Sequence, residues 1–381
     1  MGDDLAVRYR NTVLVDEDGE RHLGNFLIKA SGEWGLSNGD EDVQADIDGS
    51  SLLLTKTFQN WHTHLGMQLN ARDFSDGYPL HRWLDEAIFP TESRLTPEYV
   101  KVGASSAVCE LIRTGSSFAA DMYFYPETSA KVISKAGIRA LLGGPISDIA
   151  LPSHPEGVDS AFDELDRLLA TNGQNPNFDF AIATHSIYLC SEETLCKASE
   201  LAQRHGARLH IHISETRKEV TDCHKKTGMY PIEYLNNIDF FKPGTICAHA
   251  SWVKKNEIAL LKKHEATAVH CPSSNMKLAT GGTMSYPVYR DAGVDVRIGT
   301  DGAGSSGSGL DMRAESRLAS LIQRHDHWDA TLLSAKEVYR LATKGSQDWA
   351  AWNLDDIRMR PKGRSSNRHL ANLIYSNADC V

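Results

Sequence analysis

The sequence has no long run of apolar residues and no surplus of positive charge. Its 381 residues include 40 Lys and Arg against 50 Asp and Glu, a formal net charge of −10 at pH 7. Without a basic surplus the chain cannot neutralise a phosphate backbone, so we expect no nucleic-acid partner. No apolar run approaches the roughly 20 residues that a membrane helix needs, and the amino-terminal segment lacks the hydrophobic core of a signal peptide. We therefore expect no membrane association.

Cysteine is sparse, and no two cysteines form a Cys-x-x-Cys pair. The seven cysteines are scattered and odd in number. So few in a chain of this length do not indicate a disulfide framework, and we expect a reducing, cytoplasmic setting. Cys271 lies in a stretch of chemical interest, but it is also typical of a small buried core residue.

A short apolar, β-prone run followed by a helical stretch recurs along most of the chain. Eight such runs occur, at residues 52–58, 118–122, 138–142, 178–183, 207–213, 245–248, 266–269 and 294–298. Helical stretches lie between them, at residues 97–113, 127–136, 158–170, 192–205, 231–236, 255–264 and 286–292. Strands that alternate with helices pair in parallel, and eight units close a TIM barrel. We predict an α/β fold built on a (β/α)₈ barrel.

The two ends of the chain fit neither barrel strands nor barrel helices. The first 50 residues are polar and punctuated by Gly and Asp, and residues 369–376 are typical of a strand. We predict a small β-sandwich domain made of residues 1–50 and 360–381, beside a barrel domain at 51–359. Two further helices, at 311–325 and 335–349, are expected after the eighth strand, and a charged loop at 353–368.

Histidine and carboxylate side chains collect where the predicted strands end. A barrel enzyme keeps its reacting groups at the carboxyl ends of its strands. Six of the eight predicted strands lead to such residues, in chain order His62 and His64, His185, His212 and Glu215, His249, His270, and Asp301. This positional pattern favours an enzyme.

The residues His62 and His64 are candidate metal ligands. Two residues apart on an extended chain, their side chains share a face and can reach one ion, although a lone His-x-His is also typical of a surface loop. The fifth strand adds His210 and His212 opposite an aliphatic face, which points both rings into the barrel; we assign His210 to a hydrogen-bonded interior role. Three imidazoles plus the carboxylate of Asp301 suit one zinc or ferrous ion and leave room for a water.

The carboxylate of Glu215 lies three residues beyond His212. A carboxylate beside a metal-bound water, but off the metal, can shuttle protons. Glu215 could instead cap a helix expected at 216–223. Its position beside His212 favours the proton-transfer role.

Together these motifs resemble the amidohydrolase superfamily. The matching pieces are His-x-His at 62–64, His-x-x-Glu-Thr from 212, Ala-His-Ala around 249, Gly-Thr-Asp-Gly around 301 and His-Cys-Pro-Ser-Ser-Asn from 270. The resemblance runs from about Leu52 to Met312 and resumes near His369. Within the superfamily, the chain resembles the cytosine-deaminase-like branch that holds the 5′-methylthioadenosine, S-adenosylhomocysteine and 5′-deoxyadenosine deaminases, with triazine chlorohydrolases as cousins.

The resemblance implies a role for each of these residues. It makes His62, His64, His212 and Asp301 the ligands of one divalent metal, zinc or alternatively iron. It further implies that Glu215 protonates a purine ring nitrogen, His249 polarises the attacking water, Trp83 lines the nucleoside pocket, Glu92 holds the ribose hydroxyls and His185 reaches the substrate. Taken alone, Trp83 is also typical of core packing, and Glu92 of the first turn of the next helix.

The chain departs from the branch in ways that bear on the substrate. Enzymes of the branch that accept S-adenosylhomocysteine carry an arginine after strand three, where this chain has glycines within 139–146; the loop at 304–309 differs too, and a Gly-x-x-Ala-Asp strand is absent between 352 and 359. The resemblance therefore implies hydrolytic deamination of 5′-methylthioadenosine, 5′-deoxyadenosine or adenosine. Action on guanine, cytosine, a pterin or a triazine, and a non-catalytic ligand-binding barrel, stay open, as does association into a homo-oligomer.

Overall fold

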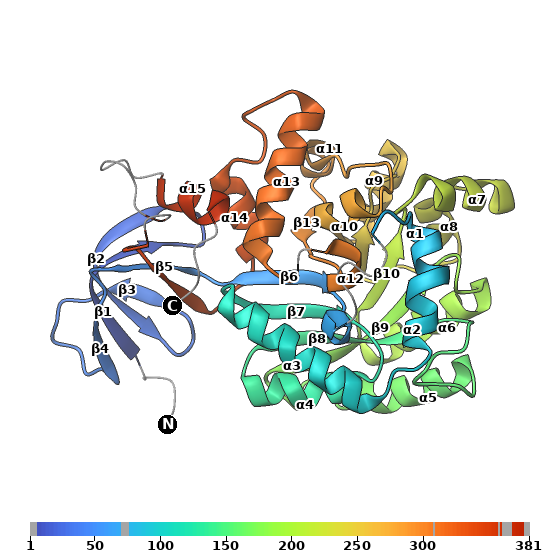
Figure 1. Ribbon diagram of the computed structural model, residues 1–381, viewed down its shortest axis with the longest axis horizontal. Helices are drawn as coiled ribbons and strands as arrows, with labels where there is room; N and C mark the ends of the chain where they lie inside the picture. The colour runs from blue at the N-terminus through green and yellow to red at the C-terminus, as the bar shows by residue number, and fades with distance from the viewer. Residues whose placement is uncertain (1–5, 70–75, 308, 357–358, 360–367, 377–381) are drawn as a thin grey trace.

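Two β-sheets organise the protein (Figure 1). The structure is a computed structural model that describes residues 6–69, 76–307, 309–356, 359 and 368–376. An eight-stranded parallel sheet forms a barrel surrounded by helices, and a six-stranded sheet lies at one side of it. The helices α13 (Met312–His327), α14 (Ala335–Thr343) and α15 (Arg368–Tyr375) lie between the two parts in this view.

The eight-stranded sheet is the predicted (β/α)₈ barrel. Its strands pair in chain order: β6 (Phe58–Thr63), β7 (Ser116–Met122), β8 (Arg139–Ile146), β9 (Phe178–Ser186), β10 (Leu209–Ile213), β11 (Ile246–His249), β12 (Thr267–His270) and β13 (Asp295–Ile298). The last strand meets the first, because Asp301 N donates to His62 O at 2.9 Å and Asp301 pairs with Thr63. At Gly299 this closure is tight: a Cβ atom there would lie 2.7 Å from His62 N, so only glycine fits.

Seven helices between the barrel strands begin and end within one residue of their predicted bounds. They are α3 (Pro97–Arg113), α4 (Pro126–Ala136), α5 (Val158–Leu169), α6 (Glu192–His205), α8 (Pro231–Asn237), α9 (Lys255–Lys263) and α11 (Tyr286–Asp291). Local capping explains the agreement. Thr96 Oγ1 accepts from Tyr99 N at 3.3 Å at the start of α3, and Gly206, at φ 61°, ends α6. Three further helices, α7 (Arg217–Thr227), α10 (Pro272–Lys277) and α12 (Ala303–Ser306), follow strands β10, β12 and β13.

The smaller sheet draws its strands from both ends of the chain. Five come from the first 56 residues: β1 (Ala6–Val15), β2 (Arg21–Lys29), β3 (Trp34–Leu36), β4 (Ala45–Asp48) and β5 (Leu52–Lys56). The sixth is β14 (Trp349–Asn353), which pairs antiparallel with β5. These described strands are hydrogen-bonded into one connected sheet, which branches at β1, in agreement with the predicted small β-domain beside the barrel. How the chain divides into domains stays a prediction.

The first predicted barrel strand, at residues 52–58, is wrong, because this run spans two sheets. Its first part is β5 in the smaller sheet, and the barrel strand β6 begins only at Phe58. Thr57 marks the crossing, where its Oγ1 lies 2.6 Å from both Ser117 Oγ and Ser346 Oγ. Both flanking strands are largely buried, so the apolar composition continues unbroken across the crossing and does not reveal it.

The helix predicted at 335–349 ends early. Helix α14 stops at Thr343, and Gly345 then turns the chain at φ 84°, a conformation that favours glycine. The residues that follow enter β14, whose Trp352 is fully buried. Apolar residues on both sides of the turn extend the helical pattern in the sequence, and this hides the change of element.

The strand predicted at 369–376 is also wrong, since these residues form helix α15. Its buried Leu370, Leu373 and Ile374 recur at helical spacing and pack toward α13 and α14. Tyr375 Oη lies 2.9 Å from Ser320 Oγ on α13. The loop predicted at 353–368 begins as a turn after Asn353; residues 357–358 and 360–367 lie outside the described part of the chain, as do 1–5 and 377–381.

Two expectations from composition bear on the described residues. No helix in this part of the chain is long and apolar enough to cross a membrane. Six of the seven cysteines are described, and all six are free thiols, in agreement with the expected lack of a disulfide framework. Cys271 is fully buried.

Candidate active site

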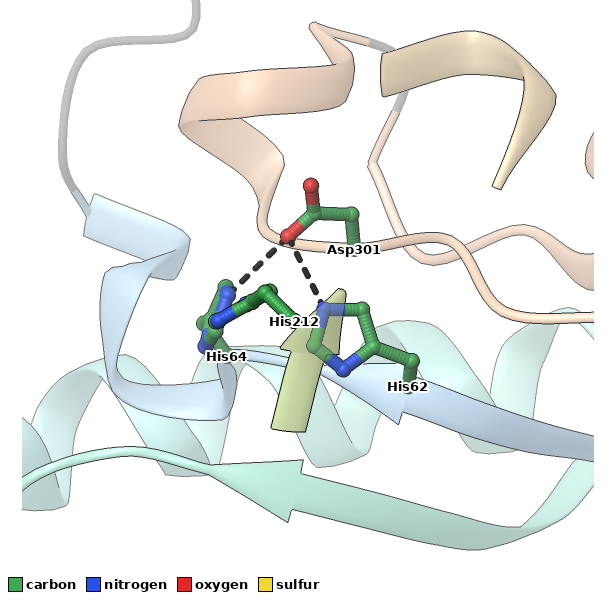
Figure 2. Close-up of side chains that lie close together, drawn as sticks. All are labelled: His62, His64, His212 and Asp301. Atoms are coloured by element: carbon green, nitrogen blue, oxygen red, sulfur yellow. Dashed lines mark ion pairs between the residues drawn. The ribbon is translucent and has the colours of Figure 1, made fainter. Parts of the chain in front are cut away.

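Four side chains from three parts of the barrel converge at the carboxyl ends of its strands (Figure 2). His62 is the penultimate residue of β6 and His64 follows this strand, His212 lies on β10, and Asp301 follows β13. One ligand atom from each lies within 4.8 Å of the others. Asp301 Oδ1 lies 3.0 Å from His64 Nε2 and 3.5 Å from His62 Nε2. The structure thus brings together the four residues that the sequence selected.

Each of the three imidazoles is oriented through its Nδ1 atom. His64 Nδ1 contacts Met122 O at 2.5 Å, and His212 Nδ1 contacts His185 O at 2.8 Å. A carbonyl oxygen only accepts, so both Nδ1 atoms carry the hydrogen. His62 Nδ1 lies 2.9 Å from His210 Nε2, which confirms the hydrogen-bonded interior role of His210. Such partners are the usual outer support of histidine metal ligands, because they fix the ring and the tautomer.

The donor set fits a divalent metal ion. His62 is fully buried, and its Nε2 has no hydrogen-bond partner among the described residues. A buried nitrogen without a partner is costly unless something else in the site binds it. Three imidazole nitrogens and one carboxylate are the ligand types that zinc and iron accept in hydrolases.

The carboxylate of Asp301 is fixed by short-range contacts that the sequence analysis missed. Ser274 Oγ donates to Asp301 Oδ2 at 2.6 Å, and Gly302 N donates to Asp301 Oδ1 at 2.7 Å. The neighbouring imidazoles of His62 and His64 offset the effect of burial and hold the pKa of Asp301 well below its usual range. Asp301 is therefore ionised. The sequence signal for Ser274 was its place in the His270-to-Asn275 motif.

Backbone conformation at the rim is unusual at three of the site positions. Ser214, His249 and Asp301 have φ values of 51°, 68° and 61°, in the left-handed region that few non-glycine residues adopt. Such residues cluster at functional sites, where the surrounding structure enforces them. All three residues lie at or just after the carboxyl ends of strands β10, β11 and β13, at the same end of the barrel as the four-residue cluster.

The side chains of Glu215 and His249 lie beside the four-residue cluster. His249 Nε2 is 3.9 Å from Glu215 Oε1 and 3.9 Å from Asp301 Oδ2. Glu215 does not cap α7: Thr216 is the N-cap residue, and its side chain accepts from Glu219 N. Burial, with the neighbouring charges of Asp301 and Glu219, raises the pKa of Glu215 well above its usual value, which favours the protonated carboxyl group.

The segment from Leu80 to Glu92 forms one wall of a cavity beside the cluster. It is a continuous helical stretch of α1 (Leu80–Trp83), η2 (Leu84–Ile88) and α2 (Phe89–Glu92), in which η2 is a π-helical turn. A π turn shifts the register of the side chains and often lies at functional sites. Trp83 lines the cavity and also packs in a buried cluster with Met67 and Leu80, as the core-packing interpretation predicts; its contact with a nucleoside stays a prediction.

The carboxyl group of Glu92 faces the same cavity. Glu92 ends α2, whereas the next helix is capped by Thr96, so the alternative of a first-turn residue is wrong. Burial raises the pKa of Glu92 to about 7 despite a hydrogen bond from Tyr123. Glu92 Oε1 has no hydrogen-bond partner among the described residues. Tyr123, at the end of β7, is a further residue that sequence reasoning missed, since it matches no expected motif.

The rest of the cavity wall is apolar. His185 is half-buried, lines the cavity beside His212, and is kept neutral because desolvation and the neighbouring His64 lower its pKa to about 3. Beyond it the wall includes Phe89, Phe124, Ile149, Leu151 and Pro152. The described lining contains no Lys or Arg. His270, by contrast, faces a separate cavity between α10 and α13.

Comparison with known proteins agrees with this geometry. The amidohydrolase family profile matches residues 53–349. The chain belongs to the amidohydrolase family. Among its curated relatives, a 5′-deoxyadenosine deaminase of Methanothermobacter thermautotrophicus is 37% identical over 338 residues, covering 88% of this chain and 75% of that protein. A 5-methylthioadenosine/S-adenosylhomocysteine deaminase of Thermococcus kodakarensis is 34% identical, covering 89% and 82%.

Solved structures show the same architecture. An adenosine deaminase from Xanthomonas campestris with bound zinc superposes with a TM-score of 0.88 at 26% identity, covering 99% of this amidohydrolase and 90% of that chain. A guanine deaminase from C. acetobutylicum superposes with a TM-score of 0.84 at 21% identity, covering 97% and 96%, a likeness of fold alone.

Proposed function

We propose that this amidohydrolase deaminates an adenine nucleoside by hydrolysis, releasing ammonia and the inosine analogue. The observation that carries the proposal is the position of Glu92, a buried carboxyl group with an unpartnered oxygen in the same cavity as the metal-binding cluster. A carboxyl group so placed suits vicinal sugar hydroxyls, which a free base lacks. The deaminase relatives at 34–37% identity support the same reaction.

The proposed cofactor is one zinc ion held by His62, His64, His212 and Asp301. When bound, such an ion lowers the pKa of a coordinated water from about 16 to about 7, so that the nucleophile is available at neutral pH. The zinc reported with the Xanthomonas campestris adenosine deaminase supports this choice over iron.

The chain's own groups then move the protons. Glu215, whose raised pKa favours the protonated form, gives a proton to the ring nitrogen next to the amino-bearing carbon as the water oxygen bonds to that carbon. Asp301, ionised beside two imidazoles, accepts the water's proton and passes one to the departing ammonia. The C–N bond breaks, the ring keeps the new oxygen, and the second proton of the water replaces the one that Glu215 gave.

Hydrogen bonding assigns His249 a donor role in this scheme. Asn275 Nδ2 lies 3.1 Å from His249 Nδ1, and an amide NH₂ group only donates, so Nδ1 accepts and the hydrogen is on Nε2. This Nε2–H lies between Glu215 and Asp301. We propose that it donates to the attacking oxygen and stabilises the charge that develops there.

The apolar part of the cavity wall, which includes Phe124, Ile149 and Leu151, determines which 5′-substituents the cavity accepts. A methylthio group, a methyl group or a hydroxyl loses little on leaving water, whereas the ammonium and carboxylate of S-adenosylhomocysteine lose strong hydration and find no described Lys or Arg in the lining. We therefore propose 5′-methylthioadenosine, 5′-deoxyadenosine or adenosine as substrate. We also propose a reducing, cytoplasmic setting, which the six free thiols support.

An ultraviolet assay over a matched panel tests the proposal. The zinc-loaded protein is offered the three neutral nucleosides, S-adenosylhomocysteine, and the free bases adenine, guanine and cytosine. We expect turnover of the neutral nucleosides, with a lower kcat/KM for S-adenosylhomocysteine and none for the free bases. Turnover of bases but not of nucleosides overturns the assignment, and turnover of a chlorinated triazine alone replaces deamination with dechlorination.

A further inference from the structure

The opposite end of the barrel holds a second cavity, of about 330 Å³, whose charged lining is mostly cationic. It lies where strands β8, β9 and β10 begin, away from the metal-binding cluster. Its charged lining residues are one carboxylate and four cations, namely Asp179, Arg139, Arg208, Arg297 and Lys344. The whole chain has a net charge of −10, so this concentration of positive charge is the reverse of its overall balance. Cationic cavities of this kind attract anions.

Three of the four cations are already paired with carboxylates. The pairs are Arg139 with Asp348 at 2.8 Å, Arg297 with Asp295 at 3.0 Å, and Lys344 with Asp295 at 2.7 Å. Arg208 forms no ion pair with any described residue. Arg208 is exposed at the cavity mouth, and desolvation together with repulsion from Arg297 lowers its pKa below its usual value. Its guanidinium group is thus held beside another cation with its donors unpaired.

An indole ring lies beneath the two arginines. The guanidinium carbons of Arg297 and Arg208 lie 4.5 Å and 5.6 Å from the centre of a Trp61 ring. Trp61 Nε1 is buried and has no hydrogen-bond partner among the described residues. A buried donor without an acceptor is uncommon and calls for a ligand or a water. The Trp61 ring thus forms an apolar floor under the two guanidinium groups, and the unpaired donors that the cavity offers come from Arg208.

We propose that this cavity binds a phosphate group, either as inorganic phosphate or as a small phosphate monoester. A phosphate group has enough acceptor oxygens to receive both N–H arms of Arg208 and still approach a second cation, which a single carboxylate serves less well. The volume admits a phosphate with a few additional atoms. Because the cavity is at the far end of the barrel, this binding does not depend on the proposed deaminase reaction.

Isothermal titration calorimetry on the zinc-loaded full chain tests this site. The titrants are inorganic phosphate and glycerol 3-phosphate, against sodium chloride of matched ionic strength. We expect saturable binding with a Kd of about 1 mM or tighter. Stronger binding of glycerol 3-phosphate than of phosphate identifies a monoester as the ligand class, and the reverse identifies the free ion.

Two matched variants separate this site from general charge attraction. Arg208→Ala removes the unpaired guanidinium and should weaken binding at least about tenfold. Arg204→Ala makes the same change in net charge on the outer side of α6, where Arg204 pairs with Asp166, and should leave binding unchanged. Arg208→Lys keeps the positive charge but loses the two parallel N–H donors of the guanidinium group, so it should bind phosphate with intermediate affinity. Absence of saturable binding, or equal affinity of the parent and Arg208→Ala, overturns the proposal.

A second measurement excludes phosphate binding at the catalytic end. Phosphate that occupied the nucleoside cavity would compete with substrate and would still bind the Arg208→Ala protein. We expect no competitive inhibition of nucleoside turnover at concentrations that saturate the calorimetric signal. Competitive inhibition, together with unchanged phosphate binding by the Arg208→Ala protein, would place the phosphate in the cavity beside the metal-binding cluster. That result would overturn the inference.

Discussion

The two ends of the barrel carry opposite charge on the same set of strands. At the carboxyl ends, Glu92, Glu215 and Asp301 line a cavity whose described residues include no Lys or Arg, whereas the amino-terminal ends present Arg139, Arg208, Arg297 and Lys344. A cation beside a carboxyl group favours the ionised form and lowers its pKa. Burial is the main cause of the raised pKa values of Glu92 and Glu215, and no Lys or Arg in the described lining opposes it. The absence of these side chains from the catalytic end therefore favours the protonated form of both carboxyl groups.

The largest effect is expected where the catalytic end loses an ionised carboxylate. Asp301→Asn removes a metal ligand and the proposed proton acceptor, so kcat/KM should fall by at least about 10³-fold, because the metal contributes several kcal/mol to such reactions. Metal analysis by mass spectrometry should show reduced zinc. Asp329→Asn, at an exposed loop, is the control and should change neither. An Asp301→Asn protein with full zinc and full activity contradicts the site.

The proton donor gives the next effect. Glu215→Gln keeps the size of the side chain but cannot give up a proton, so kcat should fall by about 10²–10⁴-fold with zinc content unchanged. Because the protonated form is active, kcat of the parent should fall as pH rises through the raised pKa of Glu215. The variant should lack this alkaline limb. Loss of zinc in Glu215→Gln would identify a ligand instead, and Glu193→Gln, at an exposed position, serves as control.

The catalytic end was easier to predict from the sequence than the connections around the barrel. His-x-His at 62–64 and Asp301 were predictable because strand ends fix where short motifs lie. Ser274, Asn275 and Tyr123 were not assigned, since their contacts depend on how separate loops meet in space. The helical α15 and the crossing at Thr57 were missed because a short apolar run reports burial and not the sheet or helix that buries it.

A smaller effect is expected from the support of a metal ligand. His210→Leu removes the partner of His62 Nδ1 at a fully buried position, and zinc affinity measured by chelator competition should fall by about 10–100-fold. His210→Gln can still hydrogen-bond, so its loss should be smaller. If both variants bind zinc like the parent, His210 only fills space.

Sugar recognition is expected to change less than metal binding. Glu92→Ala should raise KM for ribonucleosides and narrow their advantage over 2′-deoxynucleosides, because a carboxyl group built for two hydroxyls is left unpaired by a substrate that lacks one, a mismatch worth about 1–3 kcal/mol. Tyr123→Phe should narrow the preference for ribonucleosides less than Glu92→Ala does, since it removes only the hydroxyl group that hydrogen-bonds to Glu92. If Glu92→Ala loses activity equally on ribonucleosides and 2′-deoxynucleosides, the role of Glu92 is structural. The proposal of a nucleoside substrate then loses its main support.

The smallest effects are expected at the cationic end, which contrasts most directly with the catalytic end. Arg297 is 9% exposed, pairs with Asp295 and donates to Lys344 O at 2.6 Å, so Arg297→Ala should lower the free energy of unfolding by about 1–3 kcal/mol in urea. Arg208 makes no such contact with the described residues and is repelled by Arg297, so Arg208→Ala should change that free energy by less than about 0.5 kcal/mol. Both variants should keep the kcat of the parent, because neither side chain lines the cavity beside the metal-binding cluster. A large fall in kcat for Arg208→Ala would show that a charge at the amino-terminal end of the barrel affects catalysis at the carboxyl end. The two ends would then not be functionally independent.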